Sequence, residues 1–116
     1  MSRTYEQWIP RRLRDPFEKA LAMDAGHVLD FSDRTFADFF FEVMSIDTSI
    51  TNHFDARGRS KAKRLRSFIE KAPAGVVAKL LRELWEYRES LSWPSVGIRD
   101  NYFSVVAIFE GAPDHI

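Results

Sequence analysis

Residues 60–91 read SKAKRLRSFIEKAPAGVVAKLLRELWEYRESL and contain two helical patterns separated by one proline. Ser60 is a good helix cap, and apolar residues follow it at helical spacing: Leu65, Phe68, Ile69 and Ala72. Pro73 ends this pattern because proline lacks an N–H and clashes with the preceding helical turn. A second apolar stripe then begins, made of Val77, Leu80, Leu81, Leu84 and Leu91. The stretch therefore predicts two consecutive helices, over about 61–72 and 74–91.

A third helix is predicted upstream of this pair. Ser32 can cap its start, and Phe31 and Phe36 occupy the two positions of a hydrophobic staple. One face of this helix carries Phe36, Phe40, Val43 and Met44. Phe41 points away from that face, so we expect it to be exposed and the helix to end near Ser45.

The remaining segments are less regular. Pro16, with Asp15 before it and Gly26 beyond, predicts a helix over about 16–25. Residues 46–59 are polar and predict a loop with short helical turns. Residues 101–110 are rich in β-branched and aromatic residues, which suits a strand. Their helical spacing and the flanking Asp100 and Gly111 favour a helix, with a strand as the alternative.

These elements together predict an all-α fold. We expect a single compact domain of about five helices over 16–116, preceded by a basic N-terminal segment over 1–15 that forms an arm or a short irregular helix. Of the 116 residues, 45% are hydrophobic and 14% aromatic, which is enough for one core. The chain contains no cysteine, which excludes disulfides and thiolate chemistry. Its longest apolar run, 105–109, is far below the ~18 residues of a membrane-spanning helix, so we expect a cytoplasmic protein.

Charge is sorted along the chain although the net charge is zero. Residues 1–14 are basic, 15–55 carry nine acidic against two basic side chains, and 56–82 carry nine basic against one acidic. Residues 83–116 are acidic again. Separated charge of this kind is typical of surfaces that recognise a charged partner.

The strongest candidate site is the basic segment of this pattern. Its proposed partner- or anion-binding residues are Arg57, Arg59, Lys61, Lys63, Arg64, Arg66 and Lys71, with Arg11, Arg12 and Arg14 as an extension. Several of these cations fall in the first turn of a helix, where the helix dipole favours anions and each cation costs about 0.3–1 kcal/mol. A bound phosphate or carboxylate would offset that cost. The alternative is a solvated surface whose charge is neutralised by acids such as Asp55.

Patterns typical of enzymes are absent from the sequence. The histidines, His27, His53 and His115, are far apart and lack the spacing of metal ligands. No Gly-x-Ser-x-Gly motif and no glycine-rich phosphate loop is present. We therefore expect a protein that is not an enzyme and that holds no metal and no cofactor.

Three segments resemble a known family. FSDRTFADFF (31–40), GRSKAKRLRSF (58–68) and LLRELWEYR (80–88) are similar to the helical N-terminal domain of bacterial abortive-infection proteins of the AbiJ type. The resemblance covers about residues 28–90, and its second segment is the most specific. In that family the domain precedes a separate effector, often a helical nuclease domain, in phage-defence systems. This chain ends about twenty-five residues later, so the resemblance implies either part of a longer protein or a module that works through a partner.

These observations predict a non-catalytic interaction or adaptor module in a bacterial antiphage or stress-response system. Its basic helical surface would dock onto an acidic partner protein or effector, with nucleic acid as a second possible ligand. The alternative function is a small nucleic-acid-binding regulator. An enzyme that uses carboxylates ranks behind both.

Overall fold

The computed structural model describes residues 3–49 and 52–112, and all regular structure in these ranges is helical. The elements are α1 (Tyr5–Trp8), α2 (Arg11–Ala20), η1 (Asp24–Gly26), α3 (Asp33–Met44), η2 (Asn52–Phe54), α4 (Lys61–Lys71), α5 (Ala74–Ser90) and α6 (Arg99–Glu110), where η denotes a 3₁₀ turn. The all-α prediction is confirmed. The element predicted at 101–110 is the helix α6 and not a strand.

The predicted helix starts are confirmed by their caps. The Ser32 hydroxyl accepts a hydrogen bond from Thr35 N at 3.1 Å, and the Thr35 hydroxyl accepts one from Ser32 N at 2.8 Å. Ser60 caps α4 in the same way, with Lys63 N donating to its hydroxyl at 3.2 Å. Pro73 separates α4 from α5 and occupies the N-cap position of α5. Side-chain caps and one proline thus set the limits of the central helices.

The N-terminal prediction is wrong in its boundaries. α2 begins at Arg11 and not near residue 16, because Pro10 serves as its N-cap and Pro16 lies inside the helix. The stretch 3–15, expected as an arm or a short irregular helix, contains the short helix α1 and the first half of α2. Tyr5 and Ile9 are fully buried in it, so this stretch packs as part of the helical domain. Burial of the apolar side chains in this stretch, and not the charge of its arginines, decides how the stretch folds.

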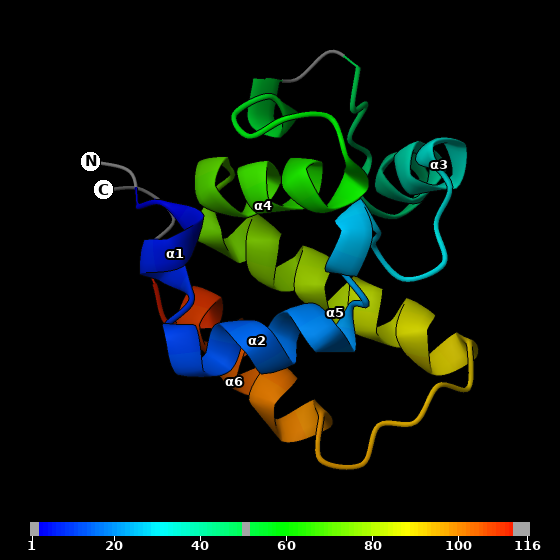
Figure 1. The fold of residues 1–116 in the computed structure, drawn as a ribbon. Helices are drawn as coiled ribbons and strands as arrows, with labels where there is room; N and C mark the ends of the chain where they lie inside the picture. Colours follow the sequence, from blue (N-terminus) through cyan, green and yellow to red (C-terminus); the bar gives the residue numbers. More distant parts are fainter. Residues whose placement is uncertain (1–2, 50–51, 113–116) are drawn as a thin grey trace.

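α5 crosses the middle of the molecule, with α4 on one side and α2 and α6 on the other (Figure 1). Its predicted stripe is buried at Val77, Leu80, Leu81 and Leu84, whereas Leu91 is only half-buried. The Cα radius of gyration is 13.2 Å, as expected for one compact domain of this length. No helix in the described part of the chain is long and apolar enough to cross a bilayer.

Aromatic rings fill much of the core. The Phe40 ring lies 5.0 Å from both Phe36 and Phe54 and 5.3 Å from Phe68, between ring centres, which joins α3, η2 and α4. On the other side of α5, Tyr102 packs against Phe17 and Trp85 at 5.4 and 4.9 Å. Trp8 and Phe109 stack at 4.7 Å and join α1 to the end of α6. Phe41 is 64% exposed, as predicted.

Candidate functional site

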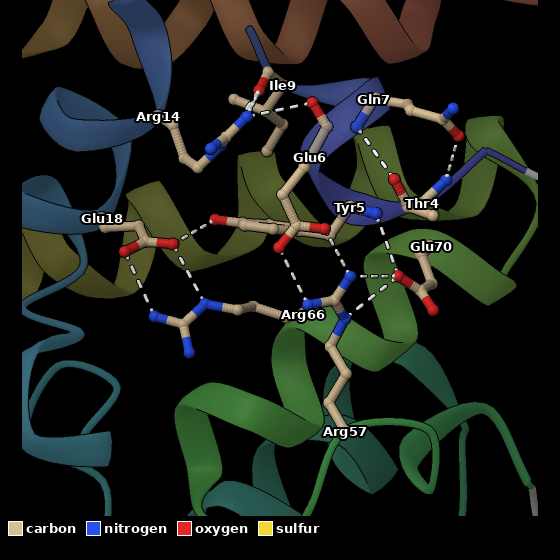
Figure 2. A network of polar contacts seen from close by, with 10 residues as sticks. All are labelled: Thr4, Tyr5, Glu6, Gln7, Ile9, Arg14, Glu18, Arg57, Arg66 and Glu70. Atoms are coloured by element: carbon tan, nitrogen blue, oxygen red, sulfur yellow. Dashed lines mark hydrogen bonds and ion pairs between the residues drawn. The ribbon is translucent and has the colours of Figure 1, made fainter. Parts of the chain in front are cut away.

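Arg57 does not point into solvent as the sequence pattern suggested. Its guanidinium donates to both carboxylate oxygens of Glu6, at 2.6 and 2.9 Å, and to one oxygen of Glu70 at 2.8 and 3.0 Å. The same Glu70 oxygen accepts from Tyr5 N at 2.9 Å. Arg57 therefore ties α1 to α4 (Figure 2). This two-point pairing holds the pKa of Glu6 below its ordinary value and raises that of Arg57.

Arg66 is paired in the same region. It donates from two nitrogens to the Glu18 carboxylate at 3.0 and 3.1 Å, and the Tyr5 hydroxyl donates to Glu18 at 2.8 Å. The Tyr5 ring centre lies 5.7 Å from the Arg57 guanidinium carbon and 5.9 Å from that of Arg66. Burial, followed by the Glu18 charge, raises the Tyr5 pKa well above its ordinary value. Figure 2 shows these side chains as one network between α1, α2 and α4, which we call the Tyr5 network.

Two more of the predicted cations contact acceptor groups of the same chain. Lys61 Nζ lies 3.6 Å from Asp33 Oδ1 at the start of α3, and the Lys61 side chain is only 14% exposed. Arg14 donates to the carbonyl oxygens of Glu6 and Ile9 at 3.0–3.2 Å, which satisfies the C-terminal end of α1. The prediction that the basic residues form one binding surface therefore does not hold for Arg57, Lys61 and Arg66, which pair with carboxylates of the same chain.

Three of the predicted cations do remain together on the surface. Arg59 and Lys63 are exposed, Arg64 is half-exposed, and no described carboxylate lies within ion-pair distance of any of them. Gly58 has a φ of +128°, and a Cβ there would come within 2.8 Å of Lys63 Cδ, so the Lys63 side chain lies across the turn that carries Arg59. We call Arg59, Lys63 and Arg64 the basic surface.

The other predicted members lie elsewhere. Lys71 is exposed at the far end of α4, eight residues or about 12 Å along the helix from Lys63. The start of α2, which carries Arg11 and Arg12, and the start of α4 lie on opposite sides of the view in Figure 1. The N-terminal arginines therefore do not extend the basic surface.

The buried Arg88 was not predicted from the sequence. It is 3% exposed, donates to Ala20 O at 2.8 Å and to Pro94 O at 2.6 Å, and lies 4.9 Å from the Trp85 ring centre. Arg88 thereby connects α5 to the end of α2 and to the loop before α6. Its position four residues after Leu84 on the buried stripe was the signal that could have identified it.

Two of the hollows outside the basic surface are lined in part by aromatic side chains. One, of about 390 Å³, is lined mainly by apolar side chains of the 46–54 segment and the α4–α5 junction, including Ile46, Phe68 and Val76. His53 borders it, with a pKa lowered by burial and then by the Lys71 charge. The other, of about 330 Å³, runs along α3 and contacts Tyr87 of α5.

No metal site forms within the described residues, because no three histidine, aspartate or glutamate side chains come together there. His115 lies outside the described residues. Comparisons with family models, curated proteins and solved structures found no match for this chain. The resemblance to the AbiJ-type domain therefore stays a prediction from the sequence.

Proposed function

We propose that this chain is a non-catalytic interaction module whose basic surface docks onto an acidic partner protein. The observation that carries the proposal is the contrast between two sets of cations in one segment. Arg57, Lys61 and Arg66 are neutralised by carboxylates of the same chain, whereas those of the basic surface are not. Unpaired cations on a rigid surface favour a partner that brings carboxylates to them.

The position of the basic surface supports the same proposal. Lys63 lies in the first turn of α4, where the helix dipole disfavours a cation by about 0.3–1 kcal/mol. An incoming carboxylate would be attracted both by the side chains and by the positive end of the helix. The Arg64 guanidinium lies 5.4 Å from the Phe54 ring centre and 5.8 Å from that of Phe36, which limits its motion and reduces the entropy lost on binding.

The biological setting of the proposal comes from the resemblance alone. An AbiJ-type domain belongs to phage defence, so the partner would be an effector protein of a bacterial antiphage or stress-response system. A plating assay with phage on bacteria that express the chain tests this setting. We expect protection that is lost in the Arg59→Glu/Lys63→Glu variant and retained in a control with the same charge change, Lys19→Glu/Lys79→Glu.

A binding measurement tests the docking surface directly. The probe is a fluorescent poly-glutamate peptide, followed by anisotropy at low salt. We expect Arg59→Glu/Lys63→Glu to weaken the affinity for the peptide at least about tenfold and Lys19→Glu/Lys79→Glu to change it little. All four side chains are exposed, so the two variants carry the same charge change and differ in its position on the surface. Equal weakening by both variants would mean that the peptide senses only net charge, and the assignment of the surface would be wrong.

The same variants separate a protein partner from nucleic acid. A nucleic-acid-binding regulator would retain duplex DNA or RNA at low salt, with an affinity that falls with a log–log slope of about −0.7 to −0.9 per phosphate contact. If the chain binds nucleic acid in this way and Arg59→Glu/Lys63→Glu abolishes the binding, the ligand of the basic surface is nucleic acid and not an acidic protein. No retention of DNA or RNA supports the protein partner.

A further inference from the structure

The hollow along α3 is a groove with an aromatic floor and an acidic edge. Thr35, Asp38, Phe39, Glu42 and Val43 line it from α3, at the spacing of one helical face over about two turns. Phe31 and Tyr87 complete the lining, and Tyr87 comes from the last turns of α5. We call this hollow the α3 groove.

The floor of the α3 groove is rigid before anything binds. Phe31 stacks on Tyr87 with ring centres 4.5 Å apart, and Phe39 lies 5.2 Å from Phe31 and 5.8 Å from Tyr87. The Tyr87 hydroxyl donates to Asp30 Oδ1 at 2.6 Å, which fixes the ring at the groove. Apolar side chains that enter the groove would therefore meet a preformed surface, and little free energy is spent on ordering it.

The edge of the groove carries negative charge. Asp38 and Glu42 are exposed one turn apart on α3, and residues 30–47 contain five acidic side chains against Arg34 alone. Arg34 lies 3.8 Å from Asp38 but is 90% exposed, so this pair neutralises little. No described cation lies within ion-pair distance of Glu42. This charge repels phosphates, which disfavours nucleic acid as the occupant.

The geometry points to a second docking site, in which the α3 groove holds a basic amphipathic helix of a partner protein. Leucine-type side chains of that helix pack on Phe39 and Tyr87, and flanking lysines or arginines pair with Asp38 and Glu42. A groove of about two helical turns matches the recognition of a helix by apolar anchors three and four residues apart. This site is independent of the basic surface, and the two together would allow the chain to join two partners of opposite charge.

The test uses a fluorescent peptide of about 14 residues made only of leucine and lysine in an amphipathic helical pattern. We expect the chain to bind this peptide with a Kd in the micromolar range, which corresponds to a binding free energy on the order of −8 kcal/mol. A poly-lysine peptide of the same length lacks the apolar anchors, so we expect it to bind at least about tenfold more weakly. Equal binding of the two peptides would overturn the role of the aromatic floor.

Two pairs of substitutions locate the site. Asp38→Lys/Glu42→Lys should weaken binding of the leucine–lysine peptide at least about tenfold, whereas Glu86→Lys/Glu89→Lys, at exposed acids of α5, should leave it within about threefold. The neutral variant Asp38→Asn/Glu42→Gln preserves side-chain shape and should show an intermediate loss. Arg59→Glu/Lys63→Glu should not weaken binding, which separates this proposal from the basic surface.

The proposal is wrong if both acidic pairs weaken binding equally, because the peptide would then sense only net charge. Sedimentation of the chain without peptide adds a further check. A dimer that dissociates in Asp38→Asn/Glu42→Gln would show that a second copy occupies the α3 groove, and the basic helix would be excluded. A monomer with unchanged sedimentation in that variant supports a separate partner.

Discussion

Arg57 places one guanidinium between carboxylates that are far apart in the sequence. Glu6 lies 51 residues before it and Glu70 lies 13 residues after it, and together the three groups attach α1 to α4. The Arg57 side chain is 25% exposed and the Glu70 side chain 16% exposed, so neither group is fully solvated. Loss of the arginine would leave the half-buried Glu70 carboxylate with the Tyr5 amide as its remaining hydrogen-bond donor among the described residues.

We predict that Arg57→Ala lowers the free energy of unfolding by about 1.5–3 kcal/mol, because hydrogen bonds to charged groups are lost and a half-buried carboxylate loses its cation. Arg59→Ala is the matched control, two residues away and exposed, with an expected change within about 0.5 kcal/mol. Urea unfolding of both variants measures the difference. Equal effects would show that the pairing of Arg57 with Glu6 and Glu70 contributes nothing to stability.

Helix caps explain why the central elements could be predicted from the sequence. Ser32 and Ser60 each offer a hydroxyl to a backbone N–H three residues later, and this requirement is local. The start of α2 could not be located in this way, because Pro10 and Pro16 are both compatible with a first turn. Only the burial of Tyr5 and Ile9 against other helices decides between them.

We predict that Ser32→Ala lowers the free energy of unfolding by about 1 kcal/mol, since the first turn of α3 loses its cap. Ser104→Ala is the control. Its hydroxyl donates to Asp100 O at 2.9 Å on the exposed side of α6, where alanine is the better helix former, so stability should be unchanged or rise by up to about 0.5 kcal/mol. Denaturation followed by far-ultraviolet circular dichroism measures both. A Ser32→Ala protein as stable as the parent would contradict the capping role.

The sorted charge of the sequence is partly neutralised when the whole molecule folds. Basic residues of 56–82 pair with acidic residues of each of the other three segments, 1–14, 15–55 and 83–116. The pairs are Arg57 with Glu6, Arg66 with Glu18 and Arg82 with Glu110. These partners are 28 or more residues apart, so sequence spacing could not reveal them. The candidate site was therefore predicted only in part: Arg59, Lys63 and Arg64 stay together on the surface and Lys71 is exposed apart from them. The pairing of Arg57, Lys61 and Arg66 depends on the tertiary fold.

The three tyrosines supply a prediction for the whole molecule at alkaline pH. A hydrogen bond to Asp30 raises the pKa of Tyr87 to about 12, and burial raises the pKa values of Tyr5 and Tyr102. In the unfolded chain these phenols ionise near pH 10. The unfolded chain therefore loses protons at lower pH than the folded one, and the tyrosine contribution to stability is complete below about pH 10 and lost as pH rises through the folded pKa values.

We expect the folded protein to show almost no tyrosinate absorbance at about pH 10, where the protein in concentrated urea is half ionised. As the pH rises further, Tyr87 should ionise first, since it alone lies at the surface, and ionisation of Tyr5 and Tyr102 should coincide with the loss of helical circular dichroism. Tyr87→Phe should remove the first phase and leave the second, because the buried phenols are unchanged. Ionisation of all three tyrosines near pH 10 with helical structure intact would contradict the burial of Tyr5 and Tyr102, and with it the packing of α1 and α6 on the core.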